Sequence, residues 1–247
     1  MRLRIIGYWG AYPGQQSATS CYLLEEDGVR VLIDAGSGAA AQLQRYIGLN
    51  EIDAAVISHF HHDHIADLGV LTYSRAVDQA LGNTAAPLRI YASDDETENL
   101  TDYSRKGTKV DTYHKDETLT IGPFKFQFQR TKHPVSCYAM KITSTASQQS
   151  IVYTADTAFS TDIAAFAENC SILIAETSFY NRQDAASFGH MTSLEAGKLA
   201  RIAGAGELIL SHLPHFGDHQ QLLHEAEEEF SGPVSLASEI QKELIFD

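Results

Sequence analysis

The sequence predicts an α/β protein with two β-sheets and outer helices. Short runs of apolar, β-branched and aromatic residues recur along the 247 residues and alternate with segments of helical spacing. Some strands are joined by tight turns, as in EEDGVRV (residues 25–31), whereas others are separated by helices. Antiparallel hairpins and crossovers are therefore mixed, which favours two sheets over a single doubly wound sheet.

Each expected strand is a short run of residues that suit a pleated, buried surface. In chain order they are LRIIGYW (3–9), CYLLEED (21–27), VRVLIDAG (29–36), DAAVIS (53–58), LRIYAS (88–93), KVDTYH (109–114), FKFQFQRTKH (124–133), CYAMKIT (137–143), SIVYTAD (150–156), SILIAET (171–177) and ELILSHL (207–213).

The expected helices are segments in which apolar residues recur every three or four positions, as in IADLGVLTYSRAV (65–77). They lie at about residues 37–47, 64–81, 95–104, 160–168, 192–204 and 218–230. No linker rich in Pro, Gly and Ser divides the chain, so we expect residues 1–247 to form one domain.

The composition is that of an acidic globular protein. It has 32 acidic and 18 basic side chains, a formal net charge of −14, which disfavours a large RNA or DNA partner. No run is apolar and long enough to cross a membrane, and the N-terminus breaks at glycine and proline before a signal-peptide core develops. Cys21, Cys137 and Cys170 lack paired spacing, which indicates free thiols in a reducing cytoplasm.

The segment SHFHHDH (58–64) follows an expected strand and precedes an expected helix, a junction at which α/β proteins bind ligands. His59 and His61 are two residues apart, so an extended segment points both in one direction. If His59 and His61 bind one metal ion, Asp63 and His64, which are adjacent at the helix start, could face a second one. The alternative is a surface loop without function.

Three further residues with metal-binding side chains follow other strands, namely His133, Asp156 and His212. Imidazole nitrogen and carboxylate oxygen suit borderline and harder divalent ions. Taken singly, His133 is also explained as a structural histidine before Pro134, and Asp156 as a turn or N-cap residue. Taken together with the histidine cluster, they predict a metal site. A carboxylate such as Asp156 can bridge two ions, whereas an imidazole cannot.

The order of these motifs resembles the metallo-β-lactamase superfamily over essentially the whole chain. The matching features are His-x-His-x-Asp-His after an apolar strand, then a single histidine, a single aspartate and a last histidine. VLIDAGSG (31–38) resembles the family's early strand and turn, with Asp34 near the metals, although Asp-Ala-Gly is also a good turn. The resemblance implies a four-layer αββα sandwich with two metal ions in a cleft at one edge.

The resemblance also implies the ligands. The two sets and their shared member are His59, His61 and His133 for one ion, Asp63, His64 and His212 for the second, and Asp156 as the bridge. Histidine-rich sites suit Zn²⁺, the expected metal, and mixed His/Asp sites also take Mn²⁺ or iron. Two such ions lower the pKa of a bridging water, which Asp63 would hold or deprotonate.

Within the superfamily, LIAETSFY (173–180) and FGHMTSLEAGKLA (188–200) resemble the ribonuclease Z branch. The resemblance implies that Glu176 orients His190, which donates a proton to the leaving oxygen or stabilises the charged phosphorane. A helix capping box formed by Thr192 and Glu195 is the plainer explanation of the same segment. Two other groups of the superfamily resemble this chain less. Lactam-cleaving members have a cysteine where this chain has Asp156, and the C-terminal domain that glyoxalase II enzymes have beyond the last motif is not expected here.

One feature departs from the branch. Members that process transfer RNA carry a long arm between the single histidine and the bridging aspartate, whereas here residues 134–155 suffice only for a hairpin. Compact members resemble phosphodiesterases that act on small or cyclic phosphodiesters. The leading prediction is therefore a dinuclear, metal-dependent phosphodiesterase with a small-molecule substrate, in the cytoplasm and not on a membrane.

Three alternatives stay open. A hydrolase of carboxylic esters, such as lactones or thioesters, would use the same scaffold. It would not need the anion-binding side chains that a phosphodiesterase needs, for which Arg130, Lys132 and Lys141 are the candidates. A ribonuclease Z-type RNA nuclease and a metal-binding protein without turnover are the others. Family members often pair, so the resemblance also allows a homodimer.

Overall fold

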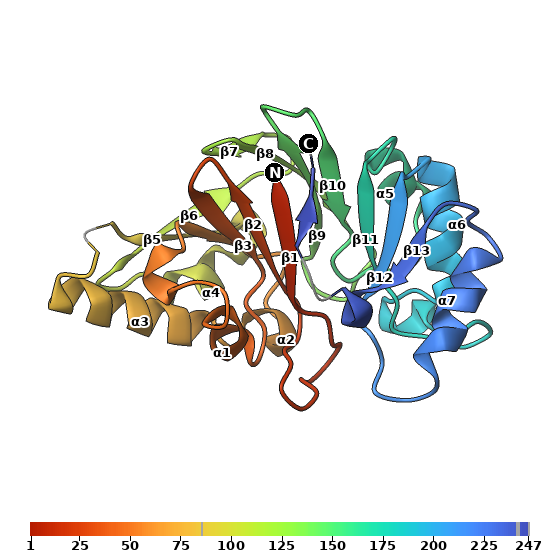
Figure 1. Ribbon diagram of the computed structural model, residues 1–247, viewed down its shortest axis with the longest axis horizontal. Helices are drawn as coiled ribbons and strands as arrows, with labels where there is room; N and C mark the ends of the chain where they lie inside the picture. Colours follow the sequence, from red (N-terminus) through yellow and green to blue (C-terminus); the bar gives the residue numbers. More distant parts are fainter. Residues whose placement is uncertain (85, 241–242, 247) are drawn as a thin grey trace. The chain divides into compact units, whose positions relative to one another are not determined.

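The computed structural model describes residues 1–84, 86–240 and 243–246. The chain forms two compact units, each with a seven-stranded sheet and its own helices (Figure 1). Unit 1 contains Met1–His114, Ile121–Pro123 and the C-terminal residues from Glu243, and unit 2 contains Lys115–Thr120 and the segment that starts at Phe124. The assignment of residues 1–247 to one domain stays a prediction. Among the described residues, no helix has the length and apolarity needed to cross a membrane.

The sheet of unit 1 has the order β14-β1-β2-β3-β4-β5-β6. Its strands are β1 (Arg2–Gly7), β2 (Cys21–Glu26), β3 (Val29–Ile33), β4 (Ala54–Val56), β5 (Leu88–Ser93), β6 (Thr108–Tyr113) and β14 (Leu244–Ile245). Strands β14 to β3 pair antiparallel, and β3 to β6 pair parallel. The predicted β2–β3 hairpin turns at Asp27 and Gly28, whose positive φ values of 50° and 80° suit a two-residue turn.

The helices of unit 1 cover one face of this sheet (Figure 1). They are α1 (Ala39–Leu43), α2 (His62–Ile65), α3 (Leu68–Leu81) and α4 (Thr97–Thr101), with 3₁₀ turns at Leu49–Glu51 and Asp94–Glu96. The helix expected over 64–81 is two helices, because Asp67 does not continue the first one. Its N–H donates to the carbonyl of Ala35 and its carboxylate accepts from the N–H of Ala40.

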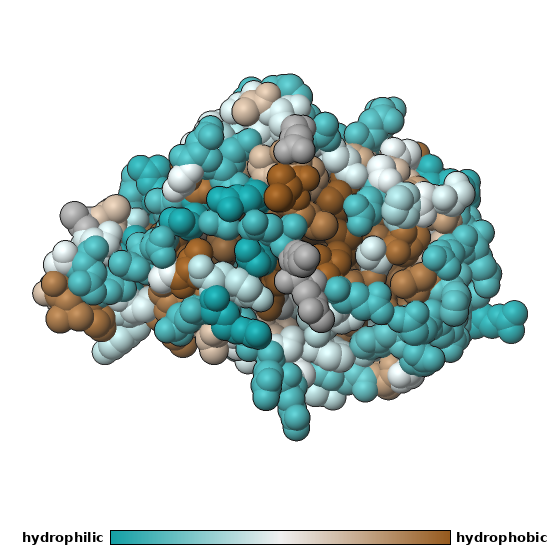
Figure 2. Space-filling view, in the orientation of Figure 1, coloured by the Kyte–Doolittle hydropathy of each residue, from teal (hydrophilic) through white to brown (hydrophobic). Residues whose placement is uncertain are grey.

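The two sides of α3 differ in character. Its outward side carries exposed apolar side chains at Val70, Tyr73, Val77 and Leu81, and Figure 2 shows a brown area over the end of this helix. Arg75 is buried and donates to the carbonyls of Ile52 and Ala86. Because a buried guanidinium is costly unless its N–H groups are bonded, these bonds hold α3 beside the start of β4.

The sheet of unit 2 has the order β13-β12-β11-β10-β9-β8-β7. Its strands are β7 (Leu119–Ile121), β8 (Phe124–Arg130), β9 (Tyr138–Ser144), β10 (Ser150–Tyr153), β11 (Ile172–Glu176), β12 (Glu207–Ser211) and β13 (Val234–Leu236). Strands β8 to β10 pair antiparallel and β10 to β13 pair parallel. The carboxyl ends of β10, β11 and β12 therefore meet at one edge.

The helices of unit 2 follow its parallel strands. They are α5 (Thr161–Phe166), α6 (Ser193–Ala203) and α7 (His219–Glu227), with 3₁₀ turns at Ala186–Phe188 and Ala237–Glu239. Helix α6 packs against both α5 and α7 (Figure 1). Thr192 caps α6 with Glu195 in the predicted capping box. The predicted α/β class with two mixed sheets and helices is thus confirmed.

The cysteines agree with the sequence prediction of free thiols. Cys21, Cys137 and Cys170 are unbonded to one another and buried. Burial raises the pKa of the Cys170 thiol to about 11 and raises that of Cys21 well above its ordinary value. Both thiols are therefore protonated and unreactive at neutral pH.

Candidate active site

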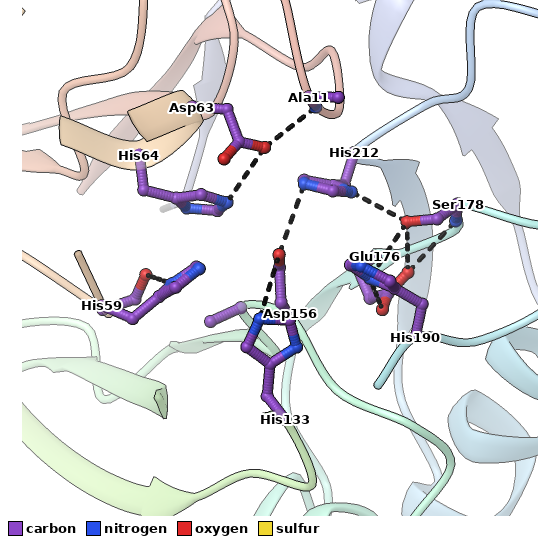
Figure 3. A network of polar contacts seen from close by, with 12 residues as sticks. Ala11, His59, Asp63, His64, His133, Asp156, Glu176, Ser178, His190 and His212 are labelled. Atoms are coloured by element: carbon purple, nitrogen blue, oxygen red, sulfur yellow. Dashed lines mark hydrogen bonds and ion pairs between the residues drawn. The ribbon is translucent and has the colours of Figure 1, made fainter. Parts of the chain in front are cut away.

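The predicted histidine cluster of unit 1 lies at the carboxyl end of β4 (Figure 3). β4 ends at Val56, a bend follows at Ser58, and His61 is the N-cap of α2 with extended backbone. The ring centroid of His59 is 4.7 Å from that of His61 and 4.1 Å from that of His64. The structure thus brings these three predicted ligands together, with His59 and His64 fully buried.

Asp34 orients two of these rings. It follows β3 with a φ of 58°, and its carboxylate accepts from His64 Nδ1 at 2.7 Å and from Ser58 Oγ at 2.8 Å. Because the Ser58 hydroxyl donates to Asp34, its oxygen accepts from His59 Nδ1 at 3.0 Å. Both rings therefore carry their proton on Nδ1 and a lone pair on Nε2, the form in which histidine binds metals.

Asp63 is held by backbone. Its Oδ2 accepts from the N–H of Ala11 at 2.9 Å and lies 3.7 Å from His64 Nε2 (Figure 3). Ala11 has a φ of 62°, a conformation that residues with a side chain rarely adopt. The N-terminal loop is thus bonded to Asp63, the aspartate predicted to hold or deprotonate the bridging water.

The predicted ligands of unit 2 lie around Asp156, which follows β10 (Figure 3). Its Oδ1 is 3.4 Å from His212 Nε2, and its Oδ2 is 4.0 Å from His133 Nε2. His133 Nδ1 donates to the carbonyl of Gly189 at 3.0 Å. Burial lowers the pKa of His133, although Asp156 opposes the shift, so its ring is neutral at pH 7 and suited to a metal.

The backbone around these ligands is strained. His212, directly after β12, and Ala155, directly before Asp156, have φ values of 53° and 49°. Together with Asp34 in unit 1, three strand ends that carry site residues are left-handed in residues other than glycine. Such conformations persist where the surrounding structure determines them, and they cluster at functional sites.

Glu176 and His190 form the pair that the sequence predicted. Glu176 ends β11, is buried, and its Oε1 accepts from His190 Nδ1 at 2.8 Å. The same carboxylate accepts from the N–H groups of Met191 and Thr157, at 3.1 and 3.2 Å. The capping box of α6 and the Glu176–His190 hydrogen bond are both present. The capping box is therefore not an alternative to the Glu176–His190 pair.

Ser178 joins this pair to His212. Its Oγ is 2.9 Å from Glu176 Oε2, 2.8 Å from His212 Nδ1 and 3.3 Å from His190 Nδ1. Because the hydroxyl donates to the carboxylate, its oxygen accepts from His212 Nδ1, which leaves the lone pair on His212 Nε2. Sequence reasoning missed the roles of Ser178 and Ser58, although both lie inside the segments that carry the predictions.

The donor set fits a divalent ion. Ligand atoms of Asp156, His190 and His212 lie within 4.8 Å of one another in unit 2. Imidazole nitrogen and carboxylate oxygen are the ligands of zinc and similar ions, and metal-binding histidines typically donate their other N–H to a protein group. Four predicted histidine ligands do so through Nδ1: His59, His64, His133 and His212.

Two of the three basic residues considered for anion binding, Lys141 and Arg130, have side-chain contacts in unit 2. Lys141 Nζ donates to the carbonyls of Phe166, the last residue of α5, and Glu168, at 3.4 and 3.0 Å. The guanidinium of Arg130 lies 6.0 Å from the ring centroid of Tyr138. The two carbonyl contacts engage two of the three N–H donors of the Lys141 ammonium group.

Two histidines outside the predicted ligand set have local partners, His114 in unit 1 and His219 in unit 2. His114 Nε2 lies 3.8 Å from Asp94, with both side chains partly exposed. His219 Nε2 donates to the carbonyl of Pro214 at 2.7 Å and so holds the backbone two residues after His212.

Comparisons with known proteins agree with this arrangement. Residues 29–213 match a family model described as a β-lactamase superfamily domain. A probable metallo-hydrolase, YhfI of Bacillus subtilis, is 43% identical over 96% of this chain and 97% of its own. Its crystal structure superposes with a TM-score of 0.93, covering 95% of both chains. A ribonuclease Z of Methanopyrus kandleri is 24% identical over 92% of both chains.

A more distant solved structure supports the fold alone. A diphosphatase of the PhnP family has a TM-score of 0.78 at 19% identity and covers 100% of this chain and 98% of that protein. The family match, the 43% identical metallo-hydrolase and the ribonuclease Z relatives agree with one another. The chain therefore belongs to the metallo-β-lactamase superfamily, in its ribonuclease Z-like branch, and has the metallo-β-lactamase fold.

Proposed function

We propose that this protein is a phosphodiesterase that hydrolyses small or cyclic phosphodiesters with two divalent metal ions, expected to be Zn²⁺. The observation that carries the proposal is the hydrogen bond between the buried Glu176 and the partly exposed His190, which lies beside Asp156 and His212 at one edge of the unit 2 sheet. A histidine held by a carboxylate next to metal-binding groups is suited to proton transfer during hydrolysis.

The proposed ligands are those implied by the family. The sets are His59, His61 and His133 for one ion, Asp63, His64 and His212 for the other, and Asp156 shared between them. When bound, such ions lower the pKa of a water and offset the negative charge of the attacked phosphodiester.

The chain's own residues supply the proton transfers. Asp63, held by Ala11, accepts the proton of the attacking water. The water oxygen bonds to phosphorus while the bond from phosphorus to the leaving oxygen breaks, and His190 gives that oxygen its proton. Glu176 keeps the His190 ring oriented and stabilises its positive charge before the transfer. The products are a phosphomonoester and an alcohol, and for a cyclic phosphodiester both groups are on one molecule.

One sequence relative favours phosphorus over carbon as the attacked atom. It is named a ribonuclease Z, and that name denotes cleavage at phosphate. A specific observation favours the second candidate, a carboxylic ester hydrolase. Lys141 is bonded to carbonyl groups at the C-terminal end of α5, which leaves fewer of its N–H donors for the anion that a phosphodiester would bring.

The test is hydrolysis of bis-para-nitrophenyl phosphate by protein of measured metal content, with and without a chelator. We expect turnover that the chelator abolishes and that added Zn²⁺ or Mn²⁺ restores. Protein with two bound metals that hydrolyses a lactone or a thioester, but no phosphodiester, would replace the proposal with the second candidate.

A further inference from the structure

An aromatic row extends from the surface of unit 2 to its candidate active site. We define it by four rings, Phe188, Phe179, His190 and His212. The centroid distances along the row are 5.8, 6.0 and 5.5 Å, with interplanar angles of 17°, 39° and 21°. The outer two rings are apolar and the inner two belong to the proposed acid and a proposed metal ligand.

The outer end of the row is exposed although it is large and apolar. Phe188 has 61% of its surface accessible. A single exposed apolar side chain needs no explanation, but Phe188 stacks on a second phenylalanine that contacts the proposed acid. A ligand bound at His190 therefore meets an apolar ring surface on this side.

The row is held in place by backbone hydrogen bonds. The N–H of Phe179 donates to Met191, and its carbonyl accepts from Ser193, at 3.3 and 2.9 Å. Gly189, directly after Phe188, has a φ of 77° and its carbonyl accepts from His133 Nδ1 at 3.0 Å. The segment that carries Phe188 and Phe179 is thus bonded to a proposed metal ligand. The entropy lost by ordering these two side chains when a ligand binds is therefore small.

We propose that Phe188 and Phe179 form a binding platform for a planar aromatic ring in the substrate's leaving group. The inference rests on the proposed function, because His190 protonates the leaving oxygen and so places the leaving group beside Phe179. Such a platform selects aryl or nucleoside phosphodiesters, because the rings of these compounds stack favourably on aromatic side chains. An aliphatic leaving group lacks that interaction.

The test measures binding directly, so it does not depend on turnover. The probes are two phosphinates, benzyl(methyl)phosphinate and (cyclohexylmethyl)(methyl)phosphinate, in which carbon replaces both ester oxygens, so neither can be hydrolysed; they share one charge and differ in aromaticity. Their Kd values are measured by titration calorimetry with metal-loaded wild type, Phe188→Ala, Phe188→Trp and Tyr73→Ala. Tyr73 is the matched control, an aromatic residue of α3 with 69% exposure.

We expect wild type to bind the benzyl phosphinate roughly 5–100-fold more tightly than the cyclohexylmethyl phosphinate. Phe188→Ala should abolish this preference at unchanged metal content, and Phe188→Trp and Tyr73→Ala should keep it. Equal affinities in wild type, or a preference that survives Phe188→Ala, would overturn the inference. The proposed function is judged separately by bis-para-nitrophenyl phosphate turnover, which survives if only the platform is wrong and is absent if the phosphodiesterase proposal is wrong.

Discussion

At the candidate site, Ser58 and Ser178 each connect a buried carboxylate to a second histidine by hydrogen bonds. In unit 1, Asp34 contacts His64 directly and His59 through the hydroxyl of Ser58. In unit 2, Glu176 contacts His190 directly and reaches another histidine through Ser178. Each unit therefore uses one buried carboxylate at a strand end to set the protonated nitrogen of two imidazoles. This shared arrangement gives the serines a positioning role that can be measured.

Replacing Ser178 by alanine should weaken metal binding. Without the hydroxyl, His212 Nδ1 loses its acceptor at 2.8 Å, and the lone pair on Nε2 is no longer fixed. We expect a loss of about 10–100-fold in Zn²⁺ affinity, the usual effect of removing a group that orients a metal ligand. A competition titration with a chromophoric chelator measures it. Ser178→Thr, which keeps a hydroxyl, should retain most of the affinity, and an unchanged affinity in Ser178→Ala would refute the role.

Replacing His190 by alanine should slow hydrolysis while the metals stay bound. Loss of a general acid costs about 10²–10⁴-fold in rate. The loss should be larger for a phenyl ester than for a para-nitrophenyl ester, because the better leaving group needs the proton less. Comparing kcat for the two leaving groups, at measured metal content, distinguishes the acid from a structural residue. Equal losses for both substrates would assign the effect to the fold of the loop.

At the scale of elements, strong periodicity made strands and helices predictable from the sequence. All eleven expected strands and all six expected helical segments are present, but the break between α2 and α3 was missed. Asp67 ends the helical turn by bonding to Ala35 and to Ala40 of α1, tertiary contacts that periodicity does not record. The short strands β7, β13 and β14 were also missed, because two or three residues carry no alternating pattern.

The candidate site was predictable for a different reason. Histidine and aspartate that directly follow apolar strands are conspicuous in a sequence, and the structure places Glu176 and His190 in contact as expected. Ser58, Ser178 and the carbonyl of Gly189 were not foreseen, since serine and glycine are common in loops and their partners are distant in sequence. The roles of the ligands themselves stay predictions.

The loop before His190 offers a comparison of two glycines with the same φ of 77°. A Cβ at Gly189 would lie 2.5 Å from Pro134 Cδ and 2.9 Å from His133 Nδ1, whereas a Cβ at Gly82 would meet nothing within 4 Å. Both substitutions by alanine carry the cost of a left-handed backbone, about 1–3 kcal/mol. Gly189→Ala should in addition displace His133 and weaken metal binding, whereas Gly82→Ala should leave it unchanged.

Thermal unfolding and metal titration of the two variants check this. A Gly189→Ala protein with wild-type metal affinity would show that the loop adapts without moving His133. A loss of metal affinity in Gly82→Ala would show that left-handed strain alone, and not the crowding at His133, is responsible.

For the whole molecule, the net charge of −14 sets the range of substrates. Proteins hold nucleic acid through cations on phosphates, and this chain has 18 basic against 32 acidic side chains. We expect no transfer-RNA precursor to bind at 150 mM salt within the range of about 10⁻⁴–10⁻⁶ M that is usual for non-specific contacts. A gel-shift titration measures this. Tight binding together with trimming of the 3′ end would revive the nuclease alternative.

The metal proposal also predicts a change in global stability. An ion that binds only the folded chain adds about 2.7 kcal/mol at a free concentration one hundred times its Kd. For a protein of this size that corresponds to a Tm increase of roughly 5–10 °C. Calorimetry of the zinc-loaded protein should therefore show a fall of this size when a chelator is added. Asp156→Ala removes the shared ligand and should bind neither ion, so its Tm should not respond to the chelator. If Asp156→Ala retained two ions and the full response, Asp156 would not be the bridge, and the family's ligand pattern would not apply to this chain.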